Sequence, residues 1–324
     1  MTLEEFYAEW NNGSDKILVH TSGSTGNPKP MMVDKSKMEA SAIITCNFLD
    51  LKQGDTALLC MPLDYIAGKM VVVRSIVRNL KLISVMPSGH PLHGLDEVPV
   101  FAAMIPMQVF NSMKIPEEKE MLMKIKHLII GGGAVDETME RELKDFPNAV
   151  WSTYGMTETL SHIALRRLNG KDASCWYTPF ESVDVSVNDE GCLVIVAPKI
   201  SDTKIITNDI VEIASDGRHF RILGRKDNVI DSGGIKIQIE EVEAMLRKYL
   251  SVPYMITKKN DCKFGEIVVL LVESKNLTKI RRVCEDVLPK YWQPKLYVEV
   301  NKLPRTETGK PARKEAAMIA ENMR

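Results

Sequence analysis

The sequence predicts an α/β fold: a mostly parallel sheet with helices plus a small β subdomain, followed by a small α+β C-terminal domain. Three observations lead to this prediction. Apolar segments alternate with segments of helical composition over the first half of the 324 residues. From about residue 182 the texture changes to short strands and turns. A chain of this length also exceeds the size at which a single hydrophobic core stops growing, so two or more domains are expected.

Short apolar runs mark the strands of the first half, and helical patterns lie between them. The expected strands are 16–20, 55–61, 80–86, 98–104, 126–130 and 149–152. The expected helices are 36–50, 69–79, 106–113 and 135–145. Such alternation implies parallel strands, with ligands at their carboxyl ends. The segment from His127 to Gly133 fits this rule, because a buried strand there leads into three glycines before a helix.

Closely spaced short strands predict a small antiparallel β subdomain in the next part of the chain. They are expected at 182–187, 192–197, 209–214 and 218–223. A boundary is expected at 225–229, between a domain 1–224 and a domain 230–324. Beyond the boundary, 239–249 predicts an amphipathic helix with acidic residues in its first turn. Strands 265–273 and 294–300 and a helix 277–288 complete the second domain.

Composition limits the classes of partner. The net charge is −1, with 42 basic and 43 acidic residues, so no global field favours nucleic acid or a membrane surface. The six cysteines lie far apart and form no Cys-x-x-Cys pair, which favours reduced, mostly buried thiols. The first residues lack the basic and apolar regions of a signal peptide, and no apolar run is long enough to span a bilayer. We therefore expect a cytoplasmic protein.

A loop rich in glycine and hydroxyl groups follows the first expected strand. The ten residues from Thr21 to Pro30 contain two glycines, four hydroxyls and Lys29. Glycine lets backbone N–H groups approach a polyphosphate, the hydroxyls donate hydrogen bonds, and the lysine supplies a cation. The loop is not a Walker A motif, because no Gly-Lys-Ser/Thr tripeptide closes it. Taken alone, this composition is also typical of a flexible surface turn.

Four later segments change that interpretation. They are Tyr154–Glu158, Thr207–Asp209, Gly224–Glu243 and Pro304–Lys310. Together with the first loop, and in this order, they resemble the adenylate-forming superfamily of acyl-CoA synthetases, peptide-synthetase adenylation domains and luciferases. The resemblance extends from Thr21 to Arg313, nearly the whole chain.

The resemblance implies a two-step reaction that uses ATP, Mg²⁺ and CoA as co-substrate. A carboxylate attacks the α-phosphorus of ATP and gives an acyl-adenylate and pyrophosphate, and a thiol then takes the acyl group. By the same resemblance, the ATP-binding residues are Thr21, Ser22, Gly23, Ser24, Thr25, Gly26, Lys29, Gly131, Gly132, Gly133, Ala134, Tyr154, Gly155, Thr157, Asp209 and Arg225.

Several of these residues receive individual roles from the resemblance. Glu158 holds Mg²⁺, a hard cation that prefers carboxylate and phosphate oxygens. Thr157 donates to the α-phosphate, where negative charge develops. Tyr154 offers an aromatic face to adenine, and the loop 131–134 lets the base approach the backbone. Asp209 accepts hydrogen bonds from both ribose hydroxyls. Standing alone, Tyr154 is more typical of a core aromatic residue.

The C-terminal segments imply a moving catalytic lysine. In the family, the lysine equivalent to Lys310 bridges the carboxylate and the α-phosphate during adenylation and then leaves with a rotating C-terminal domain. Asp227 occupies the hinge position, and Gly233 and Gly234 occupy the CoA-binding region. A mobile lysine suits this chemistry, because the second step needs space for the thiol.

Two features depart from the family pattern. Asn208 stands where glycine is usual, which we relate to the tolerance of asparagine for unusual backbone angles. Only 20 residues precede the phosphate loop, where the family carries a further subdomain. The chain therefore resembles a shortened synthetase, and uncovered sheet edges or apolar surface would favour a homodimer or another partner.

The identity of the acid depends on the segment around Tyr65 and Arg74. Residues 61–69 resemble the Pro-Leu-Phe-His-x-x-Gly segment of the family, with Tyr65 in place of the histidine. Arg74 matches the helix arginine of o-succinylbenzoate–CoA ligases of menaquinone biosynthesis. That substrate has two carboxylates, and the one that is not activated needs a cation. The alternative interpretation of Arg74 is a surface arginine whose stem packs on the helix.

Two other functions are compatible with the sequence. One is a CoA or carrier-protein ligase for a different aryl or alkyl acid. The other is a non-catalytic nucleotide-binding remnant, suggested by the short N-terminal region. The presence of both Glu158 and Lys310 argues against the remnant, because binding alone requires neither.

Overall fold

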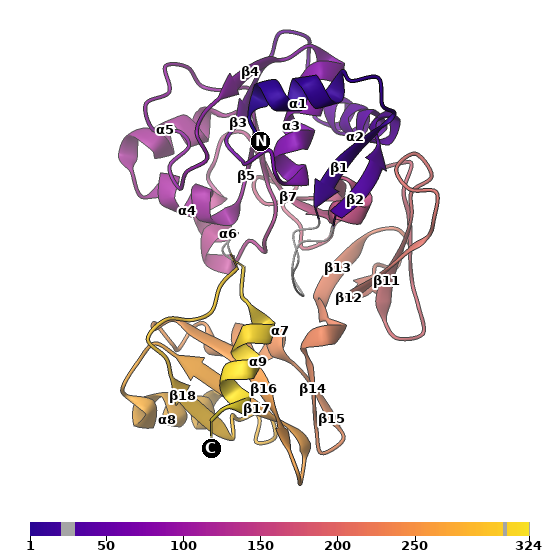
Figure 1. Ribbon diagram of the computed structural model, residues 1–324. Helices are drawn as coiled ribbons and strands as arrows, with labels where there is room; N and C mark the ends of the chain where they lie inside the picture. Colours follow the sequence, from indigo (N-terminus) through magenta and orange to yellow (C-terminus); the bar gives the residue numbers. More distant parts are fainter. Residues whose placement is uncertain (21–29, 307–309, 324) are drawn as a thin grey trace.

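A seven-stranded sheet forms the centre of the molecule (Figure 1). The computed structural model describes residues 1–20, 30–306 and 310–323. The strands of this sheet are β3 (Thr56–Leu59), β4 (Lys81–Ser84), β5 (Phe101–Met104), β6 (His127–Ile130), β7 (Ala149–Gly155), β8 (His162–Arg167) and β9 (Thr178–Pro179). Their order is β4-β3-β5-β6-β7-β8-β9, parallel from β4 to β7 and antiparallel at β8 and β9. The mostly parallel sheet is confirmed.

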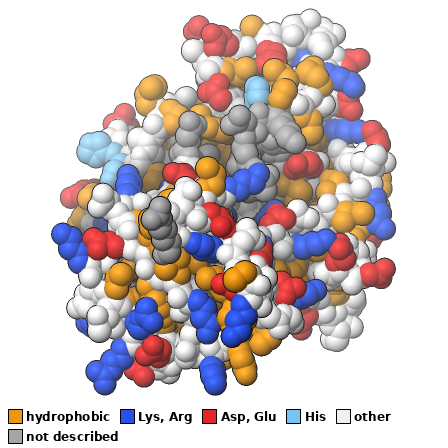
Figure 2. Space-filling model, turned by 60° about the horizontal axis from the view of Figure 1, so that its bottom comes forward, with side chains coloured by type: hydrophobic (Ala, Val, Ile, Leu, Met, Phe, Trp, Pro, Cys, Tyr) orange, Lys and Arg blue, Asp and Glu red, His pale blue; other side chains and the backbone are white. Residues whose placement is uncertain are grey.

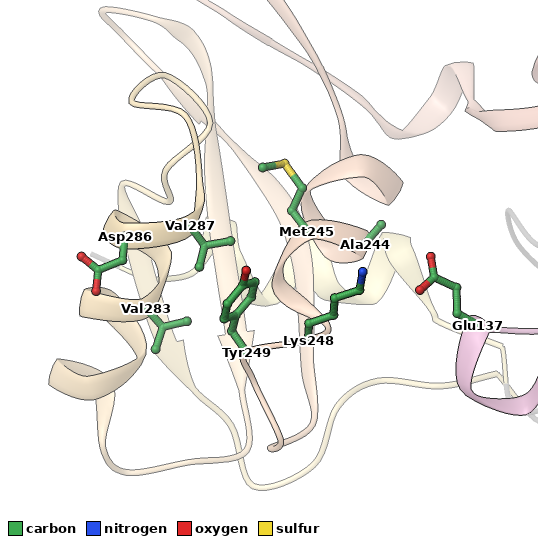
Figure 3. A pocket seen from close by; sticks show the side chains of 8 residues that line it. All are labelled: Glu137, Ala244, Met245, Lys248, Tyr249, Val283, Asp286 and Val287. Carbon is green, nitrogen blue, oxygen red and sulfur yellow. The ribbon is translucent and has the colours of Figure 1, made fainter. Parts of the chain in front are cut away.

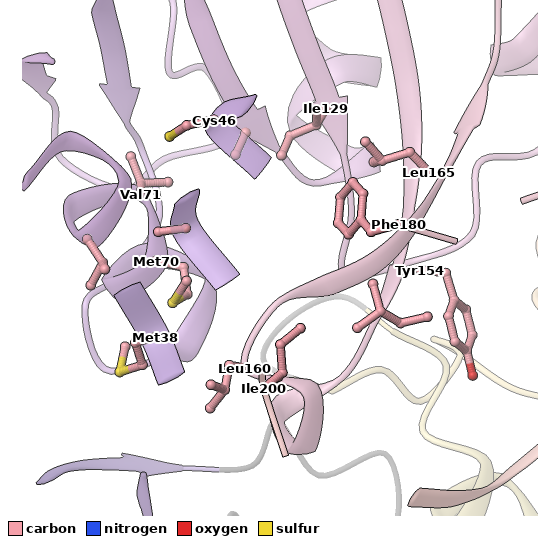
Figure 4. Close-up of a cluster of buried hydrophobic side chains, with 14 of the residues drawn as sticks. Met38, Cys46, Met70, Val71, Ile129, Tyr154, Leu160, Leu165, Phe180 and Ile200 are labelled. Atoms are coloured by element: carbon pink, nitrogen blue, oxygen red, sulfur yellow. The ribbon is translucent and has the colours of Figure 1, made fainter. Parts of the chain in front are cut away.

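The central strands are mostly apolar because helices cover both of their faces. In β3, Ala57 and Leu59 pack into one core and Leu58 into the other, as the period of two requires. One core contains residues of α1 (Leu3–Trp10), α2 (Lys35–Phe48) and α3 (Ile66–Arg78). The other contains residues of α4 (Pro106–Met113), α5 (Pro116–Lys124) and α6 (Glu137–Leu143). Figure 4 shows part of the first core.

The strand that precedes the phosphate loop does not join the central sheet, so this part of the prediction is wrong. β1 (Lys16–His20) pairs antiparallel with β2 (Pro30–Asp34) in a separate two-stranded sheet. Ile17 and Val19 are buried and Leu18 is exposed, so the apolar run alternates between two faces. An apolar run identifies a strand but carries no information on its partner.

A four-stranded antiparallel sheet confirms the β subdomain. It consists of β10 (Asp184–Val187), β11 (Cys192–Val196), β12 (Ile205–Ile213) and β13 (Phe220–Arg225), in that order. Its inner residues Ile195, Val211 and Phe220 belong to the same core as the helices α1 to α3. The sheet is therefore packed on the N-terminal part of the molecule.

The C-terminal part has a sheet of its own. The strands are β14 (Val229–Ser232), β15 (Ile235–Gln238), β16 (Tyr254–Asp261), β17 (Gly265–Val272) and β18 (Leu296–Glu299), with the helices α7 (Ile239–Leu246), α8 (Leu277–Val287) and α9 (Arg313–Glu321). The order is β15-β14-β17-β16, and β18 pairs parallel with β17. In β17, Val268 and Leu270 face the core with α7 and α8, whereas Val269 faces the core with α9. Within the described chain, these two cores draw only on residues from Ile230 onward.

The C-terminal part lies below the rest of the molecule in Figure 1. The connection to β13 is the short helix η2 (Lys226–Asn228). On the face shown in Figure 2, basic and acidic side chains are interspersed, in keeping with the net charge of −1. None of the helices in the described ranges is long and apolar enough to cross a membrane.

Candidate active site

A cavity of about 470 Å³ opens at the carboxyl ends of the central parallel strands. The residues that follow β3, β5, β6 and β7 all contribute to its wall, together with α3 and Lys310. Its apolar side includes Met61, Ile105 and Leu160. The site therefore lies where a parallel α/β sheet normally binds its ligand.

Glycines let the backbone form part of this wall. A Cβ at Gly131 would lie 2.4 Å from the hydroxyl oxygen of Thr153, and Gly132 has a φ of +77°. A Cβ at Gly155 would lie 2.3 Å from the carbonyl oxygen of Ser161, because β7 and β8 approach closely at a register shift. All three glycines line the cavity. Larger residues at Gly131 or Gly155 would displace the neighbouring strand or narrow the cavity.

Arg74 places a buried cation in the wall of the cavity. Its side chain is 2% exposed, and its guanidinium donates to the hydroxyl of Ser161 and lies 6.0 Å from the centre of the Phe101 ring. Burial lowers the pKa of Arg74 to about 10, so it still carries its charge at neutral pH. Among the residues of the described chain, no carboxylate pairs with it, and its Nε has no hydrogen-bond partner. A buried charge without a counterion is costly unless a ligand supplies one.

Ser161 and His162 complete the surroundings of Arg74, and sequence reasoning missed both. The Ser161 Oγ lies 3.2 Å from Nδ1 of His162, whose Nε2 lies 3.1 Å from the hydroxyl of Thr45. Burial, and then the charge of Arg74, lowers the pKa of His162 well below its usual range, so the ring is neutral at pH 7. The only signal in the sequence was their position three and four residues after the Tyr154–Glu158 segment.

Asp209, Arg225 and Tyr154 form a hydrogen-bonded group. The two oxygens of Asp209 accept from Tyr154 Oη at 2.6 Å and from Arg225 Nη1 at 2.8 Å. Burial, and then the charge of Asp209, raises the pKa of Tyr154, so its hydroxyl remains a donor. The ring of Tyr154 packs edge-on against Tyr177 and Phe220, at the edge of the core in Figure 4. It is 6% exposed and is absent from the cavity lining, so its adenine contact stays a prediction.

The two residues predicted to bind the α-phosphate and Mg²⁺, Thr157 and Glu158, both lie in the short helix η1 (Thr157–Thr159), but they have different surroundings. Thr157 is buried and lines the cavity, whereas Glu158 is exposed and lies outside its lining. Residues 1–20, 30–306 and 310–323 contain no group of three or more His, Cys, Asp or Glu side chains arranged for a metal ion. An exposed single carboxylate fits Mg²⁺, which keeps several waters and takes further oxygens from phosphates.

Lys310 reaches the cavity from the C-terminal part of the molecule. It lines the same cavity as Arg74 and Thr157. Its backbone N–H donates to Thr306 Oγ1 at 3.1 Å, and its carbonyl accepts from the Thr306 N–H at 2.8 Å. Burial, and then the nearby charge of Arg225, lowers the pKa of Lys310. Two parts of the chain with separate sheets thus meet at this site.

Polar contacts surround η2. Asp227 accepts from Arg225 Nη2 at 2.9 Å and from the amide of Asn208 at 3.3 Å, and Lys226 pairs with Glu190 at 2.6 Å. The side chain of Gln238 donates to the Arg225 carbonyl at 3.0 Å. The backbone explanation for Asn208 is wrong: it lies in β12, outside the set of described non-glycine residues with positive φ. Its amide, rather than its backbone angle, has a visible partner.

The remaining predicted site residues are divided between the cavity and other parts of the molecule. Tyr65 lines the cavity, whereas Ala134 is exposed and neither Gly133 nor Ala134 belongs to the lining. Gly233 and Gly234 form the turn between β14 and β15, away from the cavity. The phosphate-loop residues fall outside the described ranges: Thr21, Ser22, Gly23, Ser24, Thr25, Gly26 and Lys29.

A second, more open hollow of about 700 Å³ lies between α7 and α8 (Figure 3). Its walls carry Met245, Tyr249 and Val287, and Glu137 of α6 faces them from the N-terminal part. No predicted site residue lines it. The predicted chemistry therefore belongs to the cavity of Arg74 and Lys310.

Comparison with known proteins places this geometry in a family. The AMP-binding enzyme family matches residues 8–199. A 2-succinylbenzoate–CoA ligase of Listeria monocytogenes is 24% identical over 94% of this chain and 70% of its own length. An AMP-forming acyl-CoA synthetase/AMP-acid ligase II-like protein of Dyadobacter fermentans is 33% identical, with a TM-score of 0.65, over 98% of this chain and 92% of that protein. O-succinylbenzoate coenzyme A synthetase (MenE) of Bacillus subtilis, solved with ATP and magnesium, is 20% identical with a TM-score of 0.75, over 92% of this chain and 69% of that one.

The chain belongs to the family of AMP-binding enzymes, because the match covers more than half of its length. Within that family it is an AMP-forming acyl-CoA synthetase, an acid–thiol ligase. It is shorter than the curated ligases, of which it covers about 70%, and nearly as long as the Dyadobacter protein.

Proposed function

We propose that this enzyme converts o-succinylbenzoate to o-succinylbenzoyl-CoA, with release of AMP and pyrophosphate. The observation that carries the proposal is the buried, positively charged Arg74 in the cavity wall, with no carboxylate partner in the described chain. A substrate with one acid group would leave this cation unpaired. A substrate with two acid groups would supply the missing counterion.

The rest of the cavity suits the same acid. The second carboxylate would accept from Arg74 and from the hydroxyl of Ser161, which already points to the guanidinium. The apolar side chains of Met61, Ile105 and Leu160 would surround the aromatic ring. Relatives named 2-succinylbenzoate–CoA ligases, about 24% identical to this chain, support this choice.

In the first half-reaction, one carboxylate oxygen attacks the α-phosphorus of ATP, and the bond to the bridging oxygen of pyrophosphate breaks. Asp209 would accept from the ribose, Thr157 would donate to the α-phosphate, and Lys310 would stabilise the charge that develops between acid and phosphate. The loop from Thr21 to Lys29 would hold the outer phosphates. Mg²⁺ beside Glu158 would neutralise part of their charge.

In the second half-reaction, the CoA sulfur attacks the acyl carbon and AMP leaves with the bonding electrons. We propose that residues 1–224 form the fixed domain, that 225–229 form the hinge at Asp227, and that 230–324 form a mobile domain. The separate cores from Ile230 onward support this division. Rotation would withdraw Lys310 and bring the turn at Gly233 and Gly234 toward the thiol substrate.

Pyrophosphate release over a panel of acids tests the proposal. The panel contains o-succinylbenzoate, an aryl monocarboxylate and a fatty acid, each with ATP and Mg²⁺, with and without CoA. We expect release with o-succinylbenzoate, and a thioester only when CoA is present. If only a monocarboxylate is turned over, the substrate is not o-succinylbenzoate. If the thioester forms on a carrier protein and not on CoA, the acceptor is a carrier protein. Binding of the nucleotide without pyrophosphate release for any acid would contradict the proposed enzymatic activity.

A further inference from the structure

Asn208 connects the nucleotide side of the active site with the proposed hinge. Its exposed side chain extends from β12, and its Nδ2 lies 3.3 Å from both carboxylate oxygens of Asp227 in η2. Asp227 is the central residue of the three that join β13 to β14. A glycine, which is usual at this position in the family, would provide no side-chain donor.

Arg225 extends the contact to Asp209, the residue predicted to bind the ribose. One end nitrogen donates to Asp227 at 2.9 Å and the other to Asp209 at 2.8 Å, so a single guanidinium holds both carboxylates. Tyr154 donates to the remaining oxygen of Asp209. Asn208, Asp227, Arg225 and Asp209 thus form one chain of hydrogen bonds from the surface to the predicted ribose site.

These contacts are present in the orientation of the C-terminal part in which Lys310 lines the acid cavity. A contact made in one orientation and lost in another shifts the balance between them by its own free energy. The Asn208 contact joins a residue of the four-stranded sheet to the connection with the C-terminal sheet. If the C-terminal sheet turns about η2, losing this contact would cost free energy, and the contact would then favour the orientation seen here.

We propose that Asn208 is a positioning residue: through Asp227 it holds the C-terminal sheet in the orientation that delivers Lys310 to the cavity, and thereby favours adenylation over thiol transfer. This inference rests on the proposed two-step function and adds to it a residue that acts on its timing. The contact is long and exposed, so its effect is a bias rather than a lock.

The two half-reactions provide the first test. Asn208→Ala removes the amide and leaves β12 intact. We expect the ratio of thioester formation from supplied acyl-adenylate to pyrophosphate release to rise roughly 2- to 10-fold, the range for one hydrogen bond. Asn208→Asp places a carboxylate beside Asp227 and should shift the ratio further in the same direction. The matched control is Asn47→Ala: the exposed amide oxygen of Asn47, on α2, accepts from Arg78 on α3, and neither residue touches Asp227.

A distance measurement provides the second test and needs no turnover. Cys175 and Cys262 are exposed and the other four cysteines are buried, so a donor and an acceptor dye can be attached to one site in each part of the chain. We expect both Asn208 variants, and not the Asn47 control, to change the energy transfer between the dyes. The proposal would be overturned if the Asn208 variants changed both half-reactions equally and left the energy transfer between the dyes unchanged. It would also be overturned if neither the half-reactions nor the energy transfer changed. If no acid is turned over, the proposed function fails, and the dye distances alone decide the role of Asn208.

Discussion

The two charged ends of the active site are built differently. Arg74 lies on a helix inside the main core, is 2% exposed, and has a wall of fixed secondary structure around it. Lys310 comes from a part of the molecule with separate cores, and that part joins the rest through the three residues of η2 and their mostly exposed contacts. This difference suggests that the choice of acid is built into a rigid surface, whereas the step of the reaction depends on a part that can be repositioned.

The strongest way to test this comparison is to remove the lysine. Lys310→Ala should slow acyl-adenylate formation by ~10²–10³, because one donor to the developing charge is lost. Thioester formation from supplied acyl-adenylate should be affected much less. Rapid measurement of both half-reactions checks this, with the exposed Lys302→Ala as control. Equal losses in both steps would show that Lys310 does not act on adenylation alone.

Removing the buried cation Arg74 should have the next largest effect, and this effect should be limited to recognition of the acid. Arg74→Ala should lower kcat/KM for o-succinylbenzoate by roughly 10- to 150-fold, the range for a hydrogen bond to a charged group. An aryl monocarboxylate should be nearly unaffected. Arg78→Ala, one turn further along α3 and outside the cavity lining, is the matched control. A similar loss for both acids would indicate damage to the cavity rather than a lost partner.

A change at the hinge should separate the two half-reactions without touching the acid cavity. Asp227→Pro restricts φ in η2 and should leave ATP–pyrophosphate exchange largely intact while transfer to CoA falls sharply. Asp227→Ala removes the same carboxylate but keeps the backbone free, so it should transfer better than the proline variant. A folded proline variant that loses exchange, or transfers normally, would rule out a hinge of this kind.

The smallest expected effect is on the pH profile. Because burial and Arg225 lower the pKa of Lys310 from 10.5, its ammonium should lose its proton at a lower pH than an ordinary lysine. Adenylation needs the charged form, so its rate should fall as the pH rises through this lowered pKa. Competitive amine labelling of the unliganded protein, read by mass spectrometry, gives the midpoint directly. A midpoint at or above 10.5 would contradict the structural explanation.

Buried, apolar helices and strands could be predicted from the sequence, whereas several elements that carry both apolar and charged residues were missed. Strands such as β6 were recognised because both faces are covered, so that Leu128, Ile129 and Ile130 are all buried and apolar. The strand β16 carries two lysines, an asparagine and an aspartate, and the helix α9 has three charged residues at its start and one at its end, so neither was predicted. The partner of β1 could not be predicted either, because pairing depends on distant segments.

The active site showed the same pattern. Short motifs predicted Thr157 and Lys310, which the structure brings to one cavity. The burial of Arg74 could not be read from its residue type, since most arginines keep their charge in water. Ser161 became visible as a partner only through the packing of β7 against β8, which depends on Gly155.

The ion pair between Lys226 and Glu190 has a practical consequence. Both side chains are about half exposed, at 48% and 58%, so dissolved ions screen the charges beside η2 much more than the guanidinium of Arg74, which is only 2% exposed. The screening length falls from about 10 Å in 0.1 M salt to about 3 Å in 1 M salt. Raising the ionic strength should therefore weaken the contacts beside η2 much more than the interactions of Arg74. Rates of the second half-reaction measured in different buffers are comparable only at matched ionic strength.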